Sequence, residues 1–180
     1  QRIAVVTGYK REKIRHPDII TYYNPDFEKT HILHSLFCAA PEINQKFIFL
    51  YGDVLFEDFV LDKLLKAKGD INLVVRRSSG ALNGTGTNGK PEHDWVIAEE
   101  EISSIGHHLV HAQANGEFAG LASFSKEGAK VFRQVYNQLL KQNKNTRFHN
   151  ASNLKKAQFT DLIQELIDRK EKVHAVNVQS

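Results

Sequence analysis

The sequence predicts one α/β domain in which helices cover both faces of a mixed, mostly parallel β-sheet. Short apolar runs of strand length alternate with amphipathic runs of helical spacing, and turn residues separate them. The run Phe47–Tyr51 is continuous and rich in aromatic residues, which is typical of a strand buried on both faces of a parallel sheet. The 180 residues suffice for one hydrophobic core, and no internal repeat divides the chain.

The N-terminal part is expected to hold two strands and a helix. The strands are predicted at Ile3–Thr7 and Asp18–Tyr23, with an exposed turn or loop at Tyr9–Arg15 between them. Thr30 is the expected N-cap of the helix, and Pro41 is expected to stop it. Its apolar stripe comprises Ile32, Leu33, Leu36, Phe37 and Ala40.

The rest of the chain continues the alternation, which implies parallel neighbours joined by right-handed crossovers. A helix at Phe59–Lys68 is expected to end at Gly69 as a C-cap. Two more helices are expected, one capped by Ser125 and one at Phe159–Ile167. Further strands are predicted at Ile71–Val75, Trp95–Ala98, Ile102–Val110, Gly116–Phe124 and Val173–Val178.

A Gly-rich connection, residues 78–94, contains the sequence GTGTNG. A phosphate-binding loop should leave a strand and open a helix, but Lys90-Pro91 follow here and no helical pattern begins. A flap beside a substrate, or plain disorder, is therefore favoured over a phosphate cradle.

Composition excludes several classes of function. The net charge is +3, and no basic run is interleaved with aromatic residues, so no nucleic-acid partner is expected. No segment reads as a membrane span or a signal peptide, which predicts a cytoplasmic protein. The chain has no Met and opens directly into a core strand, so we expect a core fragment of a longer protein.

His107, His108 and His111 lie close together and raise the question of a zinc site. Adjacent residues of a strand point to opposite faces, and no Cys or Asp completes a ligand set at useful spacing. Polar surface histidines are the favoured interpretation.

Gly52 and Asp53 follow the central strand at its carboxyl end, the edge where open α/β sheets bind ligands. Gly52 lets the backbone bend closely, and the Asp53 carboxylate can hold a divalent metal ion that neutralises phosphates. Because Gly and Asp are also common turn formers, an ordinary strand exit is the competing interpretation.

Five blocks of sequence occur in the order found in the nucleotidyltransferase superfamily. They are IAVVTGY (3–9), YYNPDFEKTHILHSL (22–36), FIFLYGDVLF (47–56), GEFAGLASFSKEGA (116–129) and FTDLIQELIDRKEKVHAVNV (159–178). The chain most resembles the branch of choline-phosphate and 2-aminoethylphosphonate cytidylyltransferases, and the latter are sometimes fused to a phosphoenolpyruvate mutase domain. The resemblance implies a Rossmann-like core of the GT-A type.

The resemblance also implies a reaction and a metal. A phosphate or phosphonate oxygen attacks the α-phosphorus of a nucleoside triphosphate and releases pyrophosphate, with Mg²⁺ held by Asp53. Two family blocks, an N-terminal GxGxR strand-loop and a C-terminal block with a second metal-binding Asp, are not found between residues 1 and 180. We expect the fragment alone to be inactive.

The resemblance assigns further site residues. Thr30, His31, Ser35 and Gly52 fall at nucleotide-binding positions, although His31 replaces the usual Asn of the family. Asp161 matches an acidic position that faces a cationic substrate head, and an Asp in the first turn of a helix is also explained by the helix dipole. Trp95 could supply a cation–π wall or be a half-exposed core residue.

Three functions stay open at this point. The first is a cytidylyltransferase that uses CTP and a small phosphorylated or phosphonylated amine. A sugar-1-phosphate nucleotidyltransferase is the alternative enzyme, and a non-catalytic nucleotide-binding homologue comes from a different class. The base, the amine and the oligomeric state, including a homo-oligomer, are not fixed by the sequence.

Overall fold

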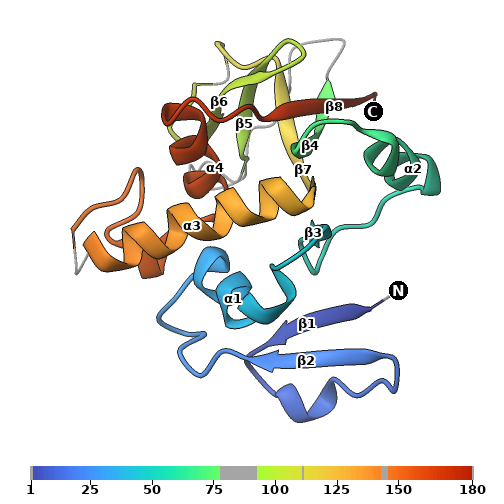
Figure 1. Ribbon diagram of the computed structural model, residues 1–180, viewed down its shortest axis with the longest axis vertical. Coiled ribbons are helices and arrows are strands. Elements are labelled where there is room, and N and C mark those ends of the chain that lie inside the picture. The colour runs from blue at the N-terminus through green and yellow to red at the C-terminus, as the bar shows by residue number, and fades with distance from the viewer. Residues whose placement is uncertain (1, 78–92, 111, 143–145, 180) are drawn as a thin grey trace.

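The computed structural model describes residues 2–77, 93–110, 112–142 and 146–179, and these residues form two β-sheets with helices around them (Figure 1). The smaller sheet pairs β1 (Ile3–Thr7) with β2 (Ile19–Tyr23) in parallel. The larger sheet has the strand order β6-β5-β7-β4-β8, and β3 also pairs with β7. Its strands are β3 (Phe47–Leu50), β4 (Ile71–Arg77), β5 (Trp95–Ala98), β6 (Ile102–Gly106), β7 (Gly116–Phe124) and β8 (His174–Gln179).

Strand β7 determines the direction of its neighbours. It pairs antiparallel with β3, β4 and β5, so these three strands all run in one direction, and β8 runs parallel to β4. Among the described strands of this sheet, β6 and β7 run the other way. The mixed sheet is confirmed, but among its described strands β4 and β8 are the one pair that runs parallel, and the other pairings are antiparallel. Strands β3 and β4 are not neighbours as the crossover pattern suggested, because β7 lies between them.

Gly120 is the point at which β7 changes its partner along one edge. Residues Gly116 and Glu117 pair with β5, whereas residues 121–124 pair with β3. Gly120 has φ +79°, and a Cβ there would lie 2.8 Å from Val54 Cγ2, so the position requires glycine. The Tyr51 amide donates to the Gly120 carbonyl at 3.0 Å. This switch brings the end of β3 beside the start of β5.

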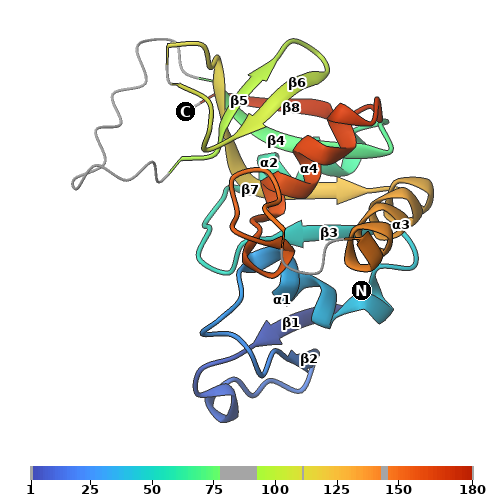
Figure 2. The same cartoon turned by 90° about the vertical axis from the view of Figure 1, so that its left-hand side faces the viewer.

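The expectation that Phe47–Tyr51 is buried on both faces is wrong. The strand ends at Leu50, whose exposed fraction is 45%, and its pairing within the described residues is with β7 alone. Its aromatic side chains still contribute to the core, since Phe47 stacks on Phe124 and Phe49 stacks on Phe159 at centroid distances of 4.5 and 4.2 Å. The two-stranded sheet lies beyond β3 without pairing to it among the described residues (Figure 2).

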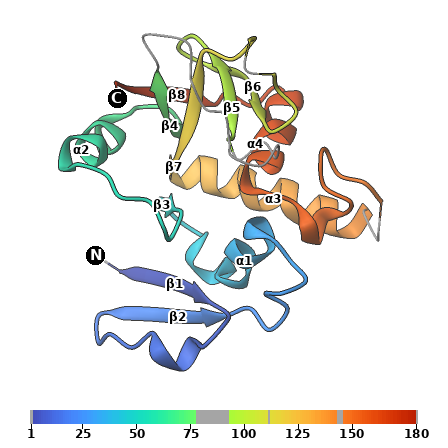
Figure 3. The same cartoon turned by 180° about the vertical axis from the view of Figure 1, so that it is seen from behind.

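Alternate residues of β4 face two separate hydrophobic clusters. Leu73 and Val75 join the larger cluster, which includes side chains of α1 (Ile32–Cys38), α3 (Lys126–Gln142) and α4 (Phe159–Asp168). Val74 faces the smaller cluster with α2 (Asp58–Lys66). Figure 3 shows α2 and α3 to either side of β7. The expected cover of both faces by helices is thus confirmed.

Several element ends differ from the sequence-based predictions. His31, not Thr30, precedes α1, and the Thr30 hydroxyl instead donates to the Asp26 carbonyl at 2.9 Å. Helix α2 ends with Ala67 as its C-cap, two residues before Gly69. The strand predicted at Ile102–Val110 stops at Gly106, where a backbone with φ +133° leads into a turn. The cap predicted at Ser125 is confirmed, because its Oγ accepts from the Gly128 amide at 3.0 Å.

The predicted flap, residues 78–94, lies almost entirely outside the described residues, of which it contributes His93 and Asp94. Within the described part of the chain, no helix is both long and apolar enough to cross a membrane.

Gly128 provides a test of the contact between α3 and β4. A Cβ at this position would lie 2.1 Å from the Asp70 carbonyl oxygen, a backbone atom that also accepts from the Ser125 amide. We expect Gly128→Ala to lower the free energy of unfolding by about 1–3 kcal/mol through overpacking. Urea unfolding followed by circular dichroism measures this loss.

Gly52→Ala is the matched control, because a Cβ there has no neighbour within 4 Å. Its unfolding free energy should stay within about 0.5 kcal/mol of the wild type. Equal stability of the two variants would contradict the proposed tight contact at Gly128.

Candidate functional site

A groove of about 710 Å³ opens where β3 ends, between the loop that leads into α2 and the strands β4, β7 and β8. We call it the β3–β7 groove. Its polar and aromatic lining includes Tyr51, Asp53, Arg76, Asp94, Glu117 and Phe118. Apolar side chains of α2 and β8, among them Phe59, Val60 and Val178, form another part of the wall.

Asp53 lines this groove from the turn that follows β3. Its side chain is exposed, and within the described residues the carboxylate has no hydrogen-bond or ion-pair partner. Gly52 beside it is also exposed, with open space around its Cα. A free carboxylate facing an open groove can bind a hard cation such as Mg²⁺, which keeps several waters and takes its remaining ligands from phosphates.

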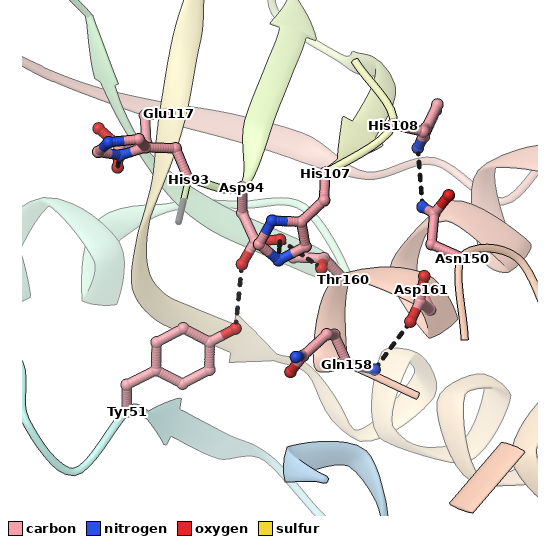
Figure 4. A network of polar contacts seen from close by, with 10 residues as sticks. All are labelled: Tyr51, His93, Asp94, His107, His108, Glu117, Asn150, Gln158, Thr160 and Asp161. Atoms are coloured by element: carbon pink, nitrogen blue, oxygen red, sulfur yellow. Dashed lines mark hydrogen bonds and ion pairs between the residues drawn. The ribbon is translucent and has the colours of Figure 1, made fainter. Parts of the chain in front are cut away.

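A buried hydrogen-bond network surrounds Asp94, which directly precedes β5 (Figure 4). Its Oδ1 accepts from Thr160 Oγ1 at 2.7 Å and lies 3.2 Å from His107 Nε2. Its Oδ2 accepts from the Tyr51 hydroxyl at 3.3 Å. Its backbone carbonyl accepts from the Phe118 amide at 2.9 Å. One residue therefore connects the end of β3, strand β7, the β6–β7 turn and the start of α4.

Burial controls the ionisation of this network. It raises the pKa of the Asp94 carboxyl above its ordinary value, although hydrogen bonds from Thr160 and Tyr51 and the charge of His107 oppose the shift. Burial, followed by the charge of Asp94, also raises the pKa of Tyr51, which stays a neutral donor. The charge of Asp161 adds to both shifts.

Glu117 forms a second acidic centre on the groove wall, and it is fully paired. Its carboxylate is bound by Arg76 and by His93 Nδ1. Figure 4 shows the His93 ring against Glu117, beside Asp94. The His93 ring also lies 5.0 Å from the ring of Trp95. The Arg76 guanidinium balances the charge of Glu117, whereas among the described residues the basic side chain next to Asp94 is His107.

The residues assigned to the nucleotide by resemblance lie in two places. Gly52 lies between Tyr51 and Asp53, which both line the groove. Thr30 and His31 lie between β2 and α1, and Ser35 lies on α1. The Asn24 side-chain amide donates to Thr30 Oγ1 at 2.9 Å and to Ser35 Oγ at 3.0 Å. This cluster holds the β2–α1 connection in shape, and the His31 side chain is exposed at its end.

The two residues predicted to bind the substrate head are both buried. Trp95 is 6% exposed, so it is a core residue rather than a half-exposed one, and it is not part of the groove lining. Asp161 is 6% exposed and accepts from the Gln158 amide at 2.8 Å in a capping box. The helix-cap interpretation of Asp161 is thus confirmed, and its carboxylate also lies outside the groove lining.

The histidines predicted to lie on the surface behave differently from one another. His107 is half-buried against Asp94, and the Nδ1 of His108 lies 3.2 Å from Asn150 Nδ2. His111 lies outside the described residues. Among the residues that the structure describes, the one set able to share a metal ion is His149, Glu165 and Asp168. Glu165 already pairs with His149 and with Arg169 at 3.0 and 2.7 Å.

The sequence pointed to Asp53, which lines the groove, but it drew no attention to Asp94 or Glu117 and placed His107 at the surface. Asp94 stands directly before Trp95, at the junction of the Gly-rich connection and a predicted strand, and an acid at such a junction was the available signal. Glu117 carried no such signal, because its role depends on Arg76 and His93 in other elements.

Comparisons with known proteins agree with this geometry. No family model matches the chain. The curated CTP:phosphoglutamine cytidylyltransferase of Campylobacter jejuni is 26% identical over 196 residues, covering 98% of this chain and 74% of the relative. The solved structure of CTP:phosphocholine cytidylyltransferase from Streptococcus pneumoniae has a TM-score of 0.63 at 10% identity, covering 99% of this chain and 70% of that one.

A second solved structure extends the comparison. The inositol-1-phosphate CTP transferase from T. maritima has a TM-score of 0.62 at 17% identity, covering 91% of this chain and 58% of that one. The chain therefore has the nucleotidyltransferase fold, as the resemblance implied. The curated relative that the chain matches is a cytidylyltransferase. It spans little more than half of the T. maritima protein.

The raised pKa of Asp94 predicts how pH affects stability. The folded protein binds this proton more tightly than the unfolded chain, so the wild type loses stability as pH rises through the raised pKa. Asp94→Asn cannot titrate. We expect its unfolding free energy, relative to the wild type, to increase as pH rises above 3.8, the ordinary carboxyl value, and to level off above the raised pKa.

Urea unfolding of both proteins at a series of pH values measures this difference. A difference that shrinks with rising pH would show that Asp94 is a stabilising carboxylate in the folded protein. A constant difference would show that folding does not raise its pKa, and either result contradicts the predicted direction.

Proposed function

We propose that this chain is the core of a metal-dependent cytidylyltransferase. It joins the cytidylyl group of CTP to a small phosphorylated or phosphonylated amine and releases pyrophosphate. The observation that carries this proposal is the free carboxylate of Asp53 in the β3–β7 groove of a nucleotidyltransferase fold. The preference for CTP is supported by the cytidylyltransferase relative.

The proposed mechanism needs positioning and charge neutralisation rather than a general base, because the attacking phosphate oxygen is already ionised. Mg²⁺ bound to Asp53 would neutralise the triphosphate and polarise its α-phosphorus. The donor chemistry fits, since a carboxylate oxygen is a hard ligand and this one has no competing partner among the described residues. The turn after β3 holds the Asp53 carboxylate in the groove, where it would hold the metal ion.

We assign the nucleotide to the side of the groove that carries Gly52. Open space around Gly52 allows a phosphate or ribose to approach the backbone closely. His31 contributes an exposed ring from the start of α1, while Thr30 and Ser35 act through the Asn24 cluster that shapes the loop. This is a different role from the direct contacts expected for Thr30 and Ser35.

A sugar-1-phosphate nucleotidyltransferase is the second candidate. The observation in its favour is that a putative glucose-1-phosphate thymidylyltransferase from Bacillus anthracis shares the fold, with a TM-score of 0.56 at 9% identity. The two candidates differ in the acceptor, because a sugar phosphate carries no cationic head.

Pyrophosphate release by the full-length gene product tests the proposal. Each of the four nucleoside triphosphates is combined with phosphocholine, 2-aminoethylphosphonate, phosphoglutamine or glucose-1-phosphate, in the presence of Mg²⁺. Release with CTP and an amine is the expected result. Release with UTP or dTTP and the sugar phosphate would favour the second candidate. No release from the folded protein with any pair would favour a nucleotide-binding homologue without catalysis.

Asp53→Ala tests the metal site. Loss of the metal ligand should remove several kcal/mol of transition-state stabilisation, so kcat/KM should fall by about 10³-fold or more. The melting temperature should be unchanged, because the Asp53 carboxylate makes no hydrogen bond or ion pair within the described residues. Steady-state kinetics and thermal unfolding measure the two effects.

Asp62→Asn is the charge-matched control, since Asp62 is an exposed carboxylate on α2 that does not line the groove. It should keep the wild-type kcat/KM. Turnover by Asp53→Ala within a few fold of the wild type would remove Asp53 from the metal site.

A further inference from the structure

We infer that Asp94 is the carboxylate that receives the cationic end of the acceptor, in the same groove in which Asp53 binds the metal ion. The inference rests on the proposed function, and it names the ammonium-recognising residue of that site. It also replaces Asp161 and Trp95, the residues that the sequence resemblance assigned to this role.

The first argument is the hydrogen-bonding capacity that Asp94 retains. An ionised carboxylate has about four lone-pair sites. Oδ1 is occupied by Thr160 at 2.7 Å and by His107 at 3.2 Å. Oδ2 has one partner among the described residues, the Tyr51 hydroxyl, at the longer distance of 3.3 Å. A primary ammonium can therefore donate to Oδ2, and a quaternary ammonium, which has no N–H, can lie against it by charge attraction, without breaking the bonds that orient Oδ1.

The second argument is the charge of the groove. The Arg76 guanidinium balances the charge of Glu117, so Glu117 offers a bound cation little net attraction, whereas no Arg or Lys side chain among the described residues pairs with Asp94. Asp94 is paired with His107 and otherwise with the neutral hydroxyls of Thr160 and Tyr51. The Asp94 side chain is 11% exposed, which leaves access from the groove while shielding the charge from bulk water. A partly buried charge attracts a ligand cation more strongly than an exposed one.

The third argument is the aromatic lining next to this carboxylate. The Tyr51 and Phe118 rings both line the groove and meet edge to face, with centroids 5.7 Å apart and an interplanar angle of 80°. A carboxylate beside aromatic rings is the combination that recognises an alkylammonium group, through charge and cation–π attraction. A neutral sugar hydroxyl carries no positive charge, so it would gain neither the charge attraction nor the cation–π attraction.

The fourth argument is the cost of keeping a charge at this position. Burial raises the pKa of Asp94, so ionising this carboxyl costs more free energy in the folded protein than in the unfolded chain. An amide could keep Thr160 and His107 on its oxygen and would turn its NH2 group toward the oxygen of Tyr51. A buried charge that the fold does not require is the pattern expected at a binding site.

Asp161 does not fit the role, because its Oδ2 is used by the Gln158 amide in the capping box and its side chain is 6% exposed. It lies close enough to influence the ionisation of Asp94 and Tyr51. Asp161 therefore stabilises the N-terminus of α4, the helix that places Thr160 beside Asp94.

The test compares each amine with an uncharged isostere of the same shape. Phosphocholine is paired with 3,3-dimethylbutyl phosphate, and 2-aminoethylphosphonate with propylphosphonate. The ratio of kcat/KM for the amine over its isostere isolates the charge recognition. We expect Asp94→Asn to lower this ratio about 10- to 100-fold, the value of one charge-assisted contact. The KM for CTP should change by less than about twofold.

Three further variants make the result specific. Asp62→Asn should leave the ratio unchanged. Asp161→Asn should lower the melting temperature and keep the ratio. Tyr51→Phe keeps the ring and frees Oδ2, so it should keep or increase the preference for the amine. Asp94→Ser, a smaller neutral residue, replaces Asp94→Asn if the amide does not fold.

The inference is overturned if the Asp94 variants keep the wild-type ratio of kcat/KM for the amine over its isostere. A lower ratio in Asp161→Asn would return the role to Asp161. Wild-type protein without turnover would contradict the proposed function alone. In that case equilibrium titration of the wild type and Asp94→Asn with phosphocholine and its isostere still decides the inference. Equal affinity for both ligands in the wild type, or an unchanged preference in the variant, would reject Asp94 as the ammonium site.

Discussion

The backbone pairing of β7 is the constraint on which the rest of the structure depends. This strand bonds to β4 along one edge and to β5 and then β3 along the other, so it joins segments that lie far apart in the sequence. Such non-local pairing is entropically costly to form, and the core packed on both faces of β7 offsets that cost. The groove exists because β7 pairs with two different strands, β5 and β3, along the same edge.

The same constraint explains why the functional side chains meet. Tyr51 follows β3 and Asp94 precedes β5, and these ends come together where β7 changes partner at Gly120. Helix α4 then adds Thr160, and the turn after β6 adds His107. In this network Oδ1 of Asp94 has two partners, Thr160 and His107, whereas Oδ2 has the Tyr51 hydroxyl as its one partner among the described residues. Rigid mounting of a partly satisfied carboxylate is what a binding site requires.

Local patterns predicted most of the elements, because hydrophobic spacing and turn residues are properties of neighbouring residues. They also located Asp53, since a Gly-Asp pair after an apolar run marks a strand exit. They failed where distant residues compete: Asn24 binds the Thr30 hydroxyl that was expected to cap α1, and β7 separates β3 from β4. Asp94 was missed for the same reason, because its three side-chain partners come from three other elements.

The partner change at Gly120 divides the groove into two parts, one formed by residues that follow β3 and one by residues that precede β5. The turn with the proposed metal ligand Asp53 follows β3, while Asp94, the proposed acceptor-binding carboxylate, directly precedes β5. Substitutions on the β5 side could therefore exchange one acceptor for another without moving the group that handles the triphosphate. A single glycine in the shared strand would in this way let a lineage of enzymes diversify its acceptors while its nucleotide chemistry stays fixed.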